Sequence, residues 1–233
     1  LVIVADGLGD GLCLSAWVGE GGALRQIGKM PYPHSYGLLY SMITGYLGFR
    51  PFRHEGKLTG LAALGDRKNI KLEFPFAGDF PDRKSTVRYP LHGWVGQLEG
   101  YRREDICAWL QAGLEDDLAQ IISHYLGVSG HSRLAVAGGV FANVTLNRKV
   151  AELPEVEAIW VHPAMSDQGI ALGAALLSLS RRTQLRPRPL QHVFLGPSYS
   201  PAQCAEALDE VGLTADRPND LAAAVKHYTA IGS

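Results

Sequence analysis

The sequence has no long apolar run and few cysteines. None of its hydrophobic segments approaches the roughly 20 residues that a membrane-spanning helix needs, so we expect no membrane partner. Its three cysteines, Cys13, Cys107 and Cys204, are far apart and form no CxxC pair. This pattern predicts reduced thiols in a cytoplasmic protein, and it excludes both a disulfide framework and a zinc knuckle.

An excess of one charge is also missing. The chain has 22 Lys and Arg residues against 23 Asp and Glu residues, which gives a formal net charge of -1. A near-neutral protein generates no field that would attract a polyanion. We therefore expect no nucleic acid among its partners.

Several well-known motifs are absent. The sequence has no Walker A loop, no GxGxxG dinucleotide fingerprint and no Gly-x-Ser-x-Gly elbow. Its eight histidines form neither HxxxH nor HExxH. A metal site built only from residues of this chain is therefore not expected.

Glycine, by contrast, is abundant. The chain has 27 glycines in 233 residues, where an average protein has about 7%. This enrichment indicates many tight turns or sites lined by bare backbone. Because both ends of the sequence fall within apparent structured segments, we also expect it to be part of a longer protein.

The first part of the chain predicts a meander followed by helices. Residues 1–5 form an apolar strand, and "LCLSAWV" and "ALRQIGKM" continue it as a second and a third strand. Apolar residues then recur at helical spacing from Ser35 to Gly48, with Ser35 as N-cap. A second short helix is predicted over "EGKLTGLAAL".

The second part predicts alternating helices and strands. Residues 104–126 form the clearest amphipathic helix. Four elements follow: a strand at 133–137, a helix at about 141–153, a strand at 158–162 and a helix at about 169–180. This order predicts an α/β fold whose mixed sheet has antiparallel strands first and parallel strands after.

Composition divides the chain into a main domain and a further segment. Residues 1–180 form the predicted domain, and residues 181–191 are a basic, proline-containing linker. Residues 192–233 restart with a predicted strand and helix. We expect them to begin a second α/β domain.

Two glycine-rich corners are candidate binding sites. "VADGLGDG" places Asp6, Gly7 and Gly9 after an apolar strand, where backbone N–H groups could approach phosphate and Asp6 could hold a metal. A tight hairpin would explain the same residues. "AGGVFAN" places Gly138 and Gly139 between strand and helix.

That second corner also has two explanations. Exposed N–H groups there suit phosphate or ribose oxygens, and Asn143, one turn into the predicted helix, could bind a ribose or a base. Close packing of helix against strand would equally require the two glycines. The residues alone leave both explanations open.

Three further residues, Asp167, Glu55 and Lys57, have both a structural and a functional explanation. Asp167 lies at a strand–helix corner, where it could cap the helix or bind a metal. The small, apolar helix after it should pack tightly. Glu55 and Lys57 stand before a turn at Gly65, and a solvated helix end explains them by default.

Six segments in this order resemble the O-carbamoyltransferase family that makes carbamoylated antibiotics and nodulation factors. They are "DGLGDG", "HSYGLLYSMITGYLGF", "HEGKLTGLAALG", "GGVFANVTLN", "SDQGIALGAAL" and "FLGPSYS". The resemblance covers Val4 to about Ser200. It departs from the family at Gly56 and Thr59, where a bulky residue and a Met are usual.

The resemblance implies the second ribonuclease H-like half of an actin-like ATPase fold, with the first half and a C-terminal domain elsewhere in the same protein. It assigns ATP to the glycines at Gly7, Gly9, Gly65, Gly138 and Gly139, together with Asp6 and Asn143. Asp167 matches the family's ligand for a divalent metal, typically iron, with magnesium as the alternative. The family's two histidine ligands belong to an HxxxH of the first half.

The resemblance also implies a reaction. Carbamoyl phosphate is split, the carbamoyl group is carried on AMP, and a hydroxyl of a small-molecule acceptor then attacks it. Glu55 and Lys57 match the acid–base pair near the nucleotide. A homodimer is compatible with this assignment, and we expect the isolated chain to be inactive.

Two alternatives remain open at this point. One is a tRNA threonylcarbamoyl transferase, which shares the "GGV" corner and the late aspartate, although the near-neutral charge argues against it. The other is a non-catalytic nucleotide-binding module on the same fold.

Overall fold

A five-stranded mixed sheet in the order β3-β2-β1-β6-β7 organises the computed structural model. Its first three strands are antiparallel, and β6 and β7 run parallel to β1. The strands are β1 (Val2–Gly9), β2 (Leu12–Glu20), β3 (Ala23–Pro31), β6 (Arg133–Ala137) and β7 (Ala158–Val161). The predicted mixed α/β sheet is therefore confirmed.

The structure describes residues 1–77, 84–85, 94–183, 192–215, 219–220, 222 and 225. Contacts divide the chain into two units, Leu1–Pro187 and Arg188–Ser233. Most of the predicted linker, residues 184–191, lies outside the described residues. The boundaries of the domains therefore stay a prediction.

The meander follows from alternating burial and a tight turn. Ile3 and Ala5 are buried on the helix-covered face of the sheet. Asp10 and Gly11 both have positive φ, at 52° and 76°, and connect Gly9 to Leu12. This is the conformation that a two-residue hairpin requires, and an Asp-Gly pair favours it.

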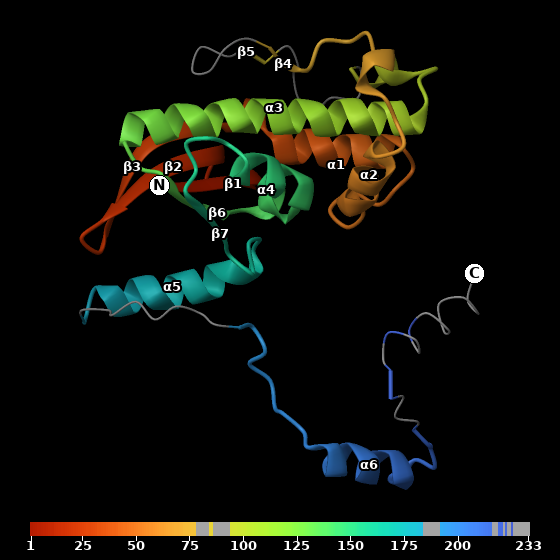
Figure 1. Ribbon diagram of the computed structural model, residues 1–233. Helices are drawn as coiled ribbons and strands as arrows, with labels where there is room; N and C mark the ends of the chain where they lie inside the picture. Colours follow the sequence, from red (N-terminus) through yellow and green to blue (C-terminus); the bar gives the residue numbers. More distant parts are fainter. Residues whose placement is uncertain are drawn as a thin grey trace. The chain divides into compact units, whose positions relative to one another are not determined.

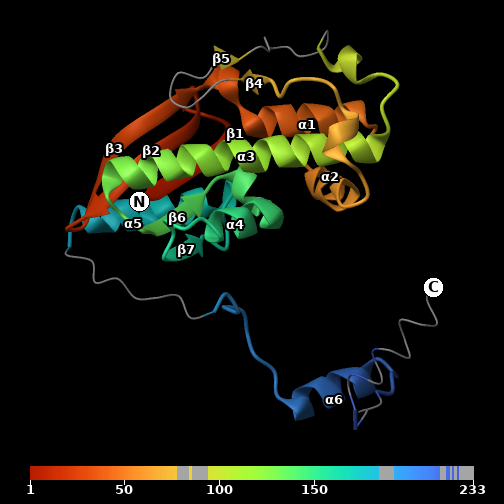
Figure 2. The same ribbon diagram turned by 45° about the horizontal axis from the view of Figure 1, so that its top comes forward.

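Helices α1 and α3 cover one face of the sheet (Figures 1 and 2). The amphipathic helix predicted over residues 104–126 buries its apolar side chains, among them Ile106, Leu110 and Leu118. The helices are α1 (Tyr36–Tyr46), α2 (Glu55–Ala62), α3 (Arg103–Ser129), α4 (Val144–Ala151), α5 (Gln168–Ser180) and α6 (Pro201–Glu210). Short elements are η1 (Tyr32–His34), η2 (Arg67–Asn69), β4 (Phe76–Ala77), β5 (Lys84–Ser85), η4 (Val95–Leu98) and η5 (Gly139–Ala142).

Hydrogen-bonding side chains set where several helices begin. Ser35 accepts a hydrogen bond from Leu38 N at the start of α1, as predicted. Ser200 and Gln203 form a capping box at the start of α6. The prediction of one helix over 141–153 was wrong, because Asn143 accepts from Leu146 N and begins α4 anew after η5.

Two other expectations were also wrong. No residue of α5 is buried, and Ile170 is 66% exposed, so this apolar helix does not pack tightly against the described residues. Residues 192–200 form no strand, although a strand was predicted at the start of this segment. None of the described helices combines the length and hydropathy needed to cross a bilayer.

Burial makes two of the three cysteines poor nucleophiles. Cys13 and Cys107 are buried and free, and Cys204 is exposed and free. Burial raises the pKa of Cys13 to about 12 and that of Cys107 to about 11. At neutral pH both buried side chains are thiols, which are poor nucleophiles.

A buried carboxylate joins the start of α3 to the loop after α2. Asp105 is 4% exposed, and its two oxygens accept hydrogen bonds from Asp66 N at 2.9 Å and from Asn69 Nδ2 at 3.0 Å. The hydrogen bond from the Asp66 backbone, and then that from Asn69, lower the pKa of Asp105. The charged form therefore stabilises the fold.

We predict that Asp105→Asn lowers the melting temperature at pH 7 and that the loss shrinks in acid. Because the folded pKa is depressed, the stabilisation is complete above the unfolded pKa of about 3.9 and is lost as pH falls through the folded pKa. Thermal melts from pH 7 to pH 3 measure this. Asp116→Asn is the control, since Asp116 pairs at the surface with Arg67 and Lys149 and should matter little. A deficit independent of pH would contradict the assignment.

Candidate functional site

A cavity of about 640 Å³ lies at the carboxyl ends of the parallel strands. We call it the strand-end cavity. Its volume is within the range of small-molecule sites, and this edge of an α/β sheet is where such sites usually form. The residues that line it are Asp6, Gly7, Tyr36, Gly37, Tyr40, Ser41, Phe52, Arg53, Glu55, Gly56, Thr59, Leu114, Gly139, Val140, Ala142, Asn143, Ser166, Asp167 and Gln168.

The first wall is the end of β1 held against the start of α1. The Ser35 hydroxyl donates to Gly7 O at 2.5 Å while it caps α1. A Cβ on Gly37 would lie 2.7 Å from Gly7 N, so only glycine permits this approach. Asp6 Oδ1 accepts from Gly7 N at 2.7 Å, which fixes its carboxylate at the cavity.

The two glycines after β6 have different surroundings. Gly138 has φ 98°, and a Cβ there would lie 2.1 Å from Ala5 O of β1. A Cβ on Gly139 would meet only Asp6 Oδ1 at 3.1 Å and Ser166 Oγ at 3.6 Å, both of which belong to the cavity wall. Strand packing therefore requires Gly138, and Gly139 forms bare floor in the cavity.

Asn143 is held by a buried polar network that the sequence did not indicate. Its Nδ2 donates to Gln111 Oε1 at 2.8 Å, and the Tyr40 hydroxyl donates to the same oxygen at 2.9 Å. Gln111 Nε2 in turn donates to Thr145 Oγ1 at 2.6 Å. Gln111 is 6% exposed. This network fixes the amide of Asn143, which keeps one N–H for a ligand.

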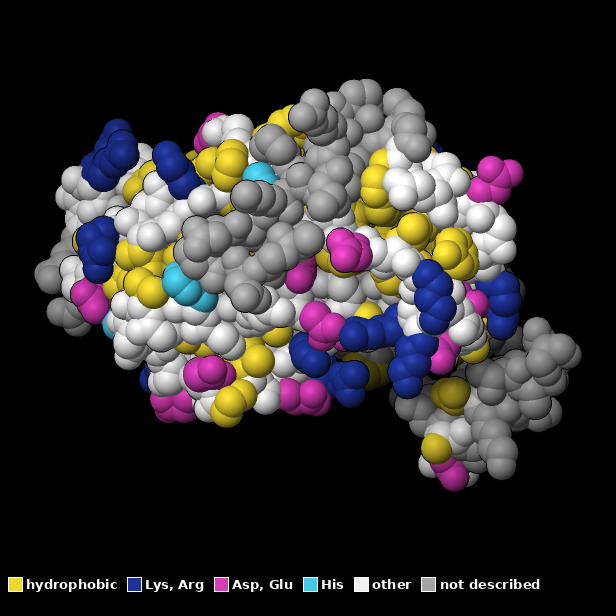
Figure 3. Space-filling model, turned by 90° about the horizontal axis from the view of Figure 1, so that it is seen from above, with side chains coloured by type: hydrophobic (Ala, Val, Ile, Leu, Met, Phe, Trp, Pro, Cys, Tyr) yellow, Lys and Arg dark blue, Asp and Glu magenta, His cyan; other side chains and the backbone are white. Residues whose placement is uncertain are grey.

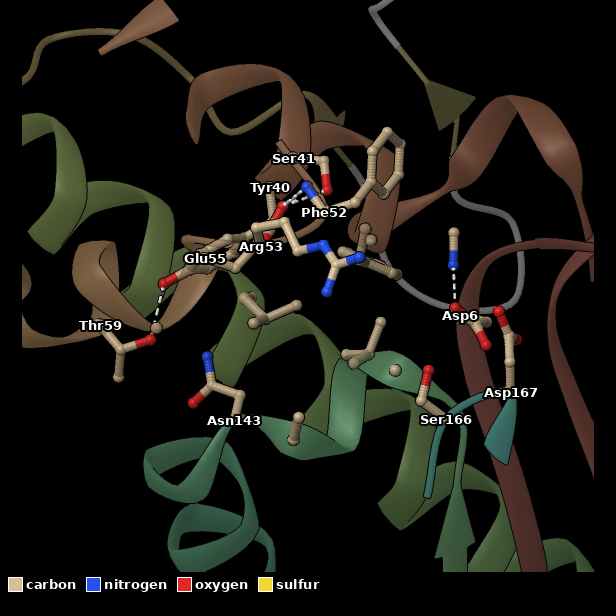
Figure 4. A pocket seen from close by; sticks show the side chains of 18 of the residues that line it. Asp6, Tyr40, Ser41, Phe52, Arg53, Glu55, Thr59, Asn143, Ser166 and Asp167 are labelled. Carbon is tan, nitrogen blue, oxygen red and sulfur yellow. Dashed lines mark hydrogen bonds between the residues drawn. The ribbon is translucent and has the colours of Figure 1, made fainter. Parts of the chain in front are cut away.

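Asp167 lies at the other end of the cavity, beside Asp6 (Figure 4). It precedes α5 but makes no side-chain hydrogen bond to the helix start. Its carboxylate is thus not used as a cap. Within the described ranges, no three His, Cys, Asp or Glu residues are grouped as a metal site would need.

Glu55 lines the cavity, but its carboxylate is already bonded. Oε1 accepts from Ser41 Oγ at 2.6 Å and from Phe52 N at 2.5 Å. Lys57 is exposed and does not line the cavity; its Nζ lies 5.4 Å from the centroid of the Phe49 ring. Of the two residues predicted to act as a pair, Glu55 lines the cavity and Lys57 does not.

Two predicted glycines also lie elsewhere. Gly9 does not line the cavity, and a Cβ on it would meet nothing within 4 Å. Gly65 does not line it either; a Cβ there would lie 2.0 Å from Glu104 O at the start of α3. Gly65 is thus explained by close backbone packing.

Several lining residues were missed in the sequence. Ser41 and Ser166 lie inside two of the six quoted segments and Arg53 directly precedes a third, but nothing in their spacing marks them as site residues. Arg53 stands two residues before Glu55 in the turn that precedes α2. Only the packing of that turn against α1 brings its side chain to the cavity.

Comparisons with known proteins agree on one family. The family model described as "Carbamoyltransferase N-terminus" matches residues 1–77 and 84–176. Nodulation protein NolNO of Sinorhizobium fredii is 33% identical over 88% of this chain and 32% of its own length. Nodulation protein NolO of Bradyrhizobium diazoefficiens is 33% identical over 88% of this chain and 40% of its own length.

A more distant match is a tRNA N6-adenosine threonylcarbamoyltransferase of Geotalea uraniireducens. It is 29% identical over 54% of this chain and 38% of its own length. The chain thus spans about a third of the length of the curated relatives that it matches.

The different surroundings of the two glycines predict different losses of stability. Gly138→Ala should lower the free energy of unfolding by at least about 2 kcal/mol, because its backbone conformation is almost restricted to glycine and the new Cβ meets the backbone of β1. Gly139→Ala should cost less than about 1 kcal/mol, since its Cβ projects into the cavity. Urea denaturation of both variants measures this. Equal losses of unfolding free energy in the two variants would show that Gly139, like Gly138, is required for packing.

Proposed function

The chain belongs to the carbamoyltransferase family, and from this we propose that it forms the ATP-binding part of a cytoplasmic enzyme that uses carbamoyl phosphate to carbamoylate a hydroxyl of a small molecule. The single observation that carries the proposal is the strand-end cavity. It adjoins a bare glycine floor at Gly139 and an oriented amide at Asn143. Phosphate can approach bare backbone, and an amide can bind a ribose or a base.

The proposed chemistry divides into two transfers. Water hydrolyses carbamoyl phosphate to carbamate and inorganic phosphate. A carbamate oxygen then attacks the α-phosphate of ATP, which forms carbamoyl adenylate and releases pyrophosphate. The acceptor hydroxyl then attacks the carbamoyl carbon, loses its proton, and the bond to AMP breaks. Asp6 and Asp167 place two carboxylates at one end of the cavity, where a proton acceptor or a ligand for a cation is required.

The described residues do not by themselves make an iron site. Asp167 has a free carboxylate, and Asp6 lies beside it, but no nitrogen or sulfur ligand joins them. We propose Asp167 as the metal ligand that this chain contributes, with the remaining ligands from another part of the protein. A divalent cation held there would polarise a phosphoryl or carbonyl oxygen.

A tRNA acceptor is less well supported than a small molecule. On the face shown in Figure 3, Lys and Arg side chains are interspersed with Asp and Glu side chains. The net charge of the chain is -1. A protein that holds tRNA ordinarily presents a basic face, so we place the acceptor among small molecules.

The intact protein should release pyrophosphate from ATP only when carbamoyl phosphate is present. The reason is that carbamate, formed by hydrolysis of carbamoyl phosphate, is the nucleophile that displaces pyrophosphate. A coupled pyrophosphate assay with and without carbamoyl phosphate measures this, with Gly139→Val as the variant that blocks the cavity and Gly60→Val, which meets nothing within 4 Å, as its control. Equal release without carbamoyl phosphate would refute the carbamoyl chemistry, and no turnover with ATP bound would favour a non-catalytic module.

A further inference from the structure

Arg53 is the one basic residue among the described residues that line the strand-end cavity. The acidic ones there are Asp6, Glu55 and Asp167. In Figure 4 the guanidinium of Arg53 points into the space between Asn143 and the Asp6–Asp167 pair. Within the described part of the chain, Arg53 forms no hydrogen bond or ion pair, although carboxylates share its cavity.

The turn that carries Arg53 has an unusual conformation. Phe52 has φ 61°, which non-glycine residues seldom adopt. Its side chain is 71% exposed, so burial of the ring does not hold this conformation. Strained backbone conformations are concentrated at functional sites.

Hydrogen bonds fix this turn instead. Glu55 Oε1 accepts from Phe52 N, and the same oxygen accepts from Ser41 Oγ of α1. Arg50 and His54 close the turn from both sides, since His54 N donates to Arg50 O at 3.0 Å and Arg50 N donates to His54 Nδ1 at 3.2 Å. The turn is therefore tied both to itself and to the cavity wall.

We propose that Arg53 binds the phosphoryl group of the ligand in the strand-end cavity and that Glu55 positions it. This inference rests on the proposed function and adds the residue that recognises phosphate. A guanidinium offers paired donors that match phosphate oxygens. With three carboxylates in the wall, a polyanionic ligand needs a cation there, and Arg53 is placed to supply it.

The proposal gives Glu55 a different task from acid–base catalysis. Its Oε1 is engaged by a backbone N–H and a hydroxyl, so it acts on the turn that carries Arg53. Removing the Glu55 carboxylate should free Phe52 from its strained φ and let Arg53 leave the cavity. Glu55 is then a positioning residue for phosphate.

Calorimetry on the intact protein tests the proposal with ATP, carbamoyl phosphate and adenosine as separate ligands. Arg53→Gln should weaken the binding of a phosphorylated ligand by about 10- to 100-fold, the usual effect of removing a charged hydrogen-bond donor, and leave adenosine affinity unchanged. A loss for ATP alone assigns Arg53 to the nucleotide, and a loss for carbamoyl phosphate alone assigns it to that donor. Arg50→Gln removes the same charge outside the cavity and should change no affinity.

Glu55→Ala separates positioning from direct contact. It should weaken binding of the same ligand. The double variant Arg53→Gln, Glu55→Ala should bind that ligand as well as Arg53→Gln alone does, because both changes remove the same interaction. Unchanged affinity in Arg53→Gln, in a protein where Gly139→Val abolishes ATP binding, overturns this inference and leaves the proposed function standing. A wild-type protein that binds no ATP overturns both.

Discussion

The contact on which the cavity depends is the close approach of Gly138 to the end of β1. A side chain at this position would strike the carbonyl oxygen of Ala5. The N–H of Gly138 also donates to Met165 O at 2.6 Å, which ties the corner after β6 to the corner after β7. One glycine thus brings three strand ends together, and it leaves Gly139 as open floor between Asp6 and Ser166.

The helices that line the cavity are held in place by polar side chains whose partners belong to other elements. Ser35 joins α1 to the end of β1, and the Gln111 network joins α1, α3 and α4 beneath Asn143. Buried polar groups are costly unless each finds a partner. Because these partners come from separate elements, the network fixes the relative positions of the helices as well as the direction of one amide.

Local patterns predicted most of the fold. Apolar segments located β1 to β3, amphipathic spacing located α3, and the cap at Ser35 located the start of α1. These features depend on residues near one another in the chain. The break at Asn143 was missed because helical spacing of apolar residues continues across it, while the cap is decided by one side-chain hydrogen bond.

The site was only partly predictable, for a physical reason. Asp6, Gly139, Asn143 and Asp167 were found because Asp6 lies beyond the part of β1 that pairs with β6 and the other three follow β6 or β7, so that all four lie at one edge of the sheet. Arg53 was missed, and Lys57, which was expected near the nucleotide, does not line the cavity. Both depend on how α2 and the turn before it pack against α1, which cannot be obtained from sequence. Gly65 resembled a binding glycine, although its contact is with the backbone of α3.

The most direct test of this account is a crystal structure of the intact protein with a non-hydrolysable ATP analogue. The account predicts that the analogue occupies the strand-end cavity, with a phosphoryl group near Gly139 and the sugar or base near Asn143. An analogue bound at another surface, with this cavity empty, would contradict it.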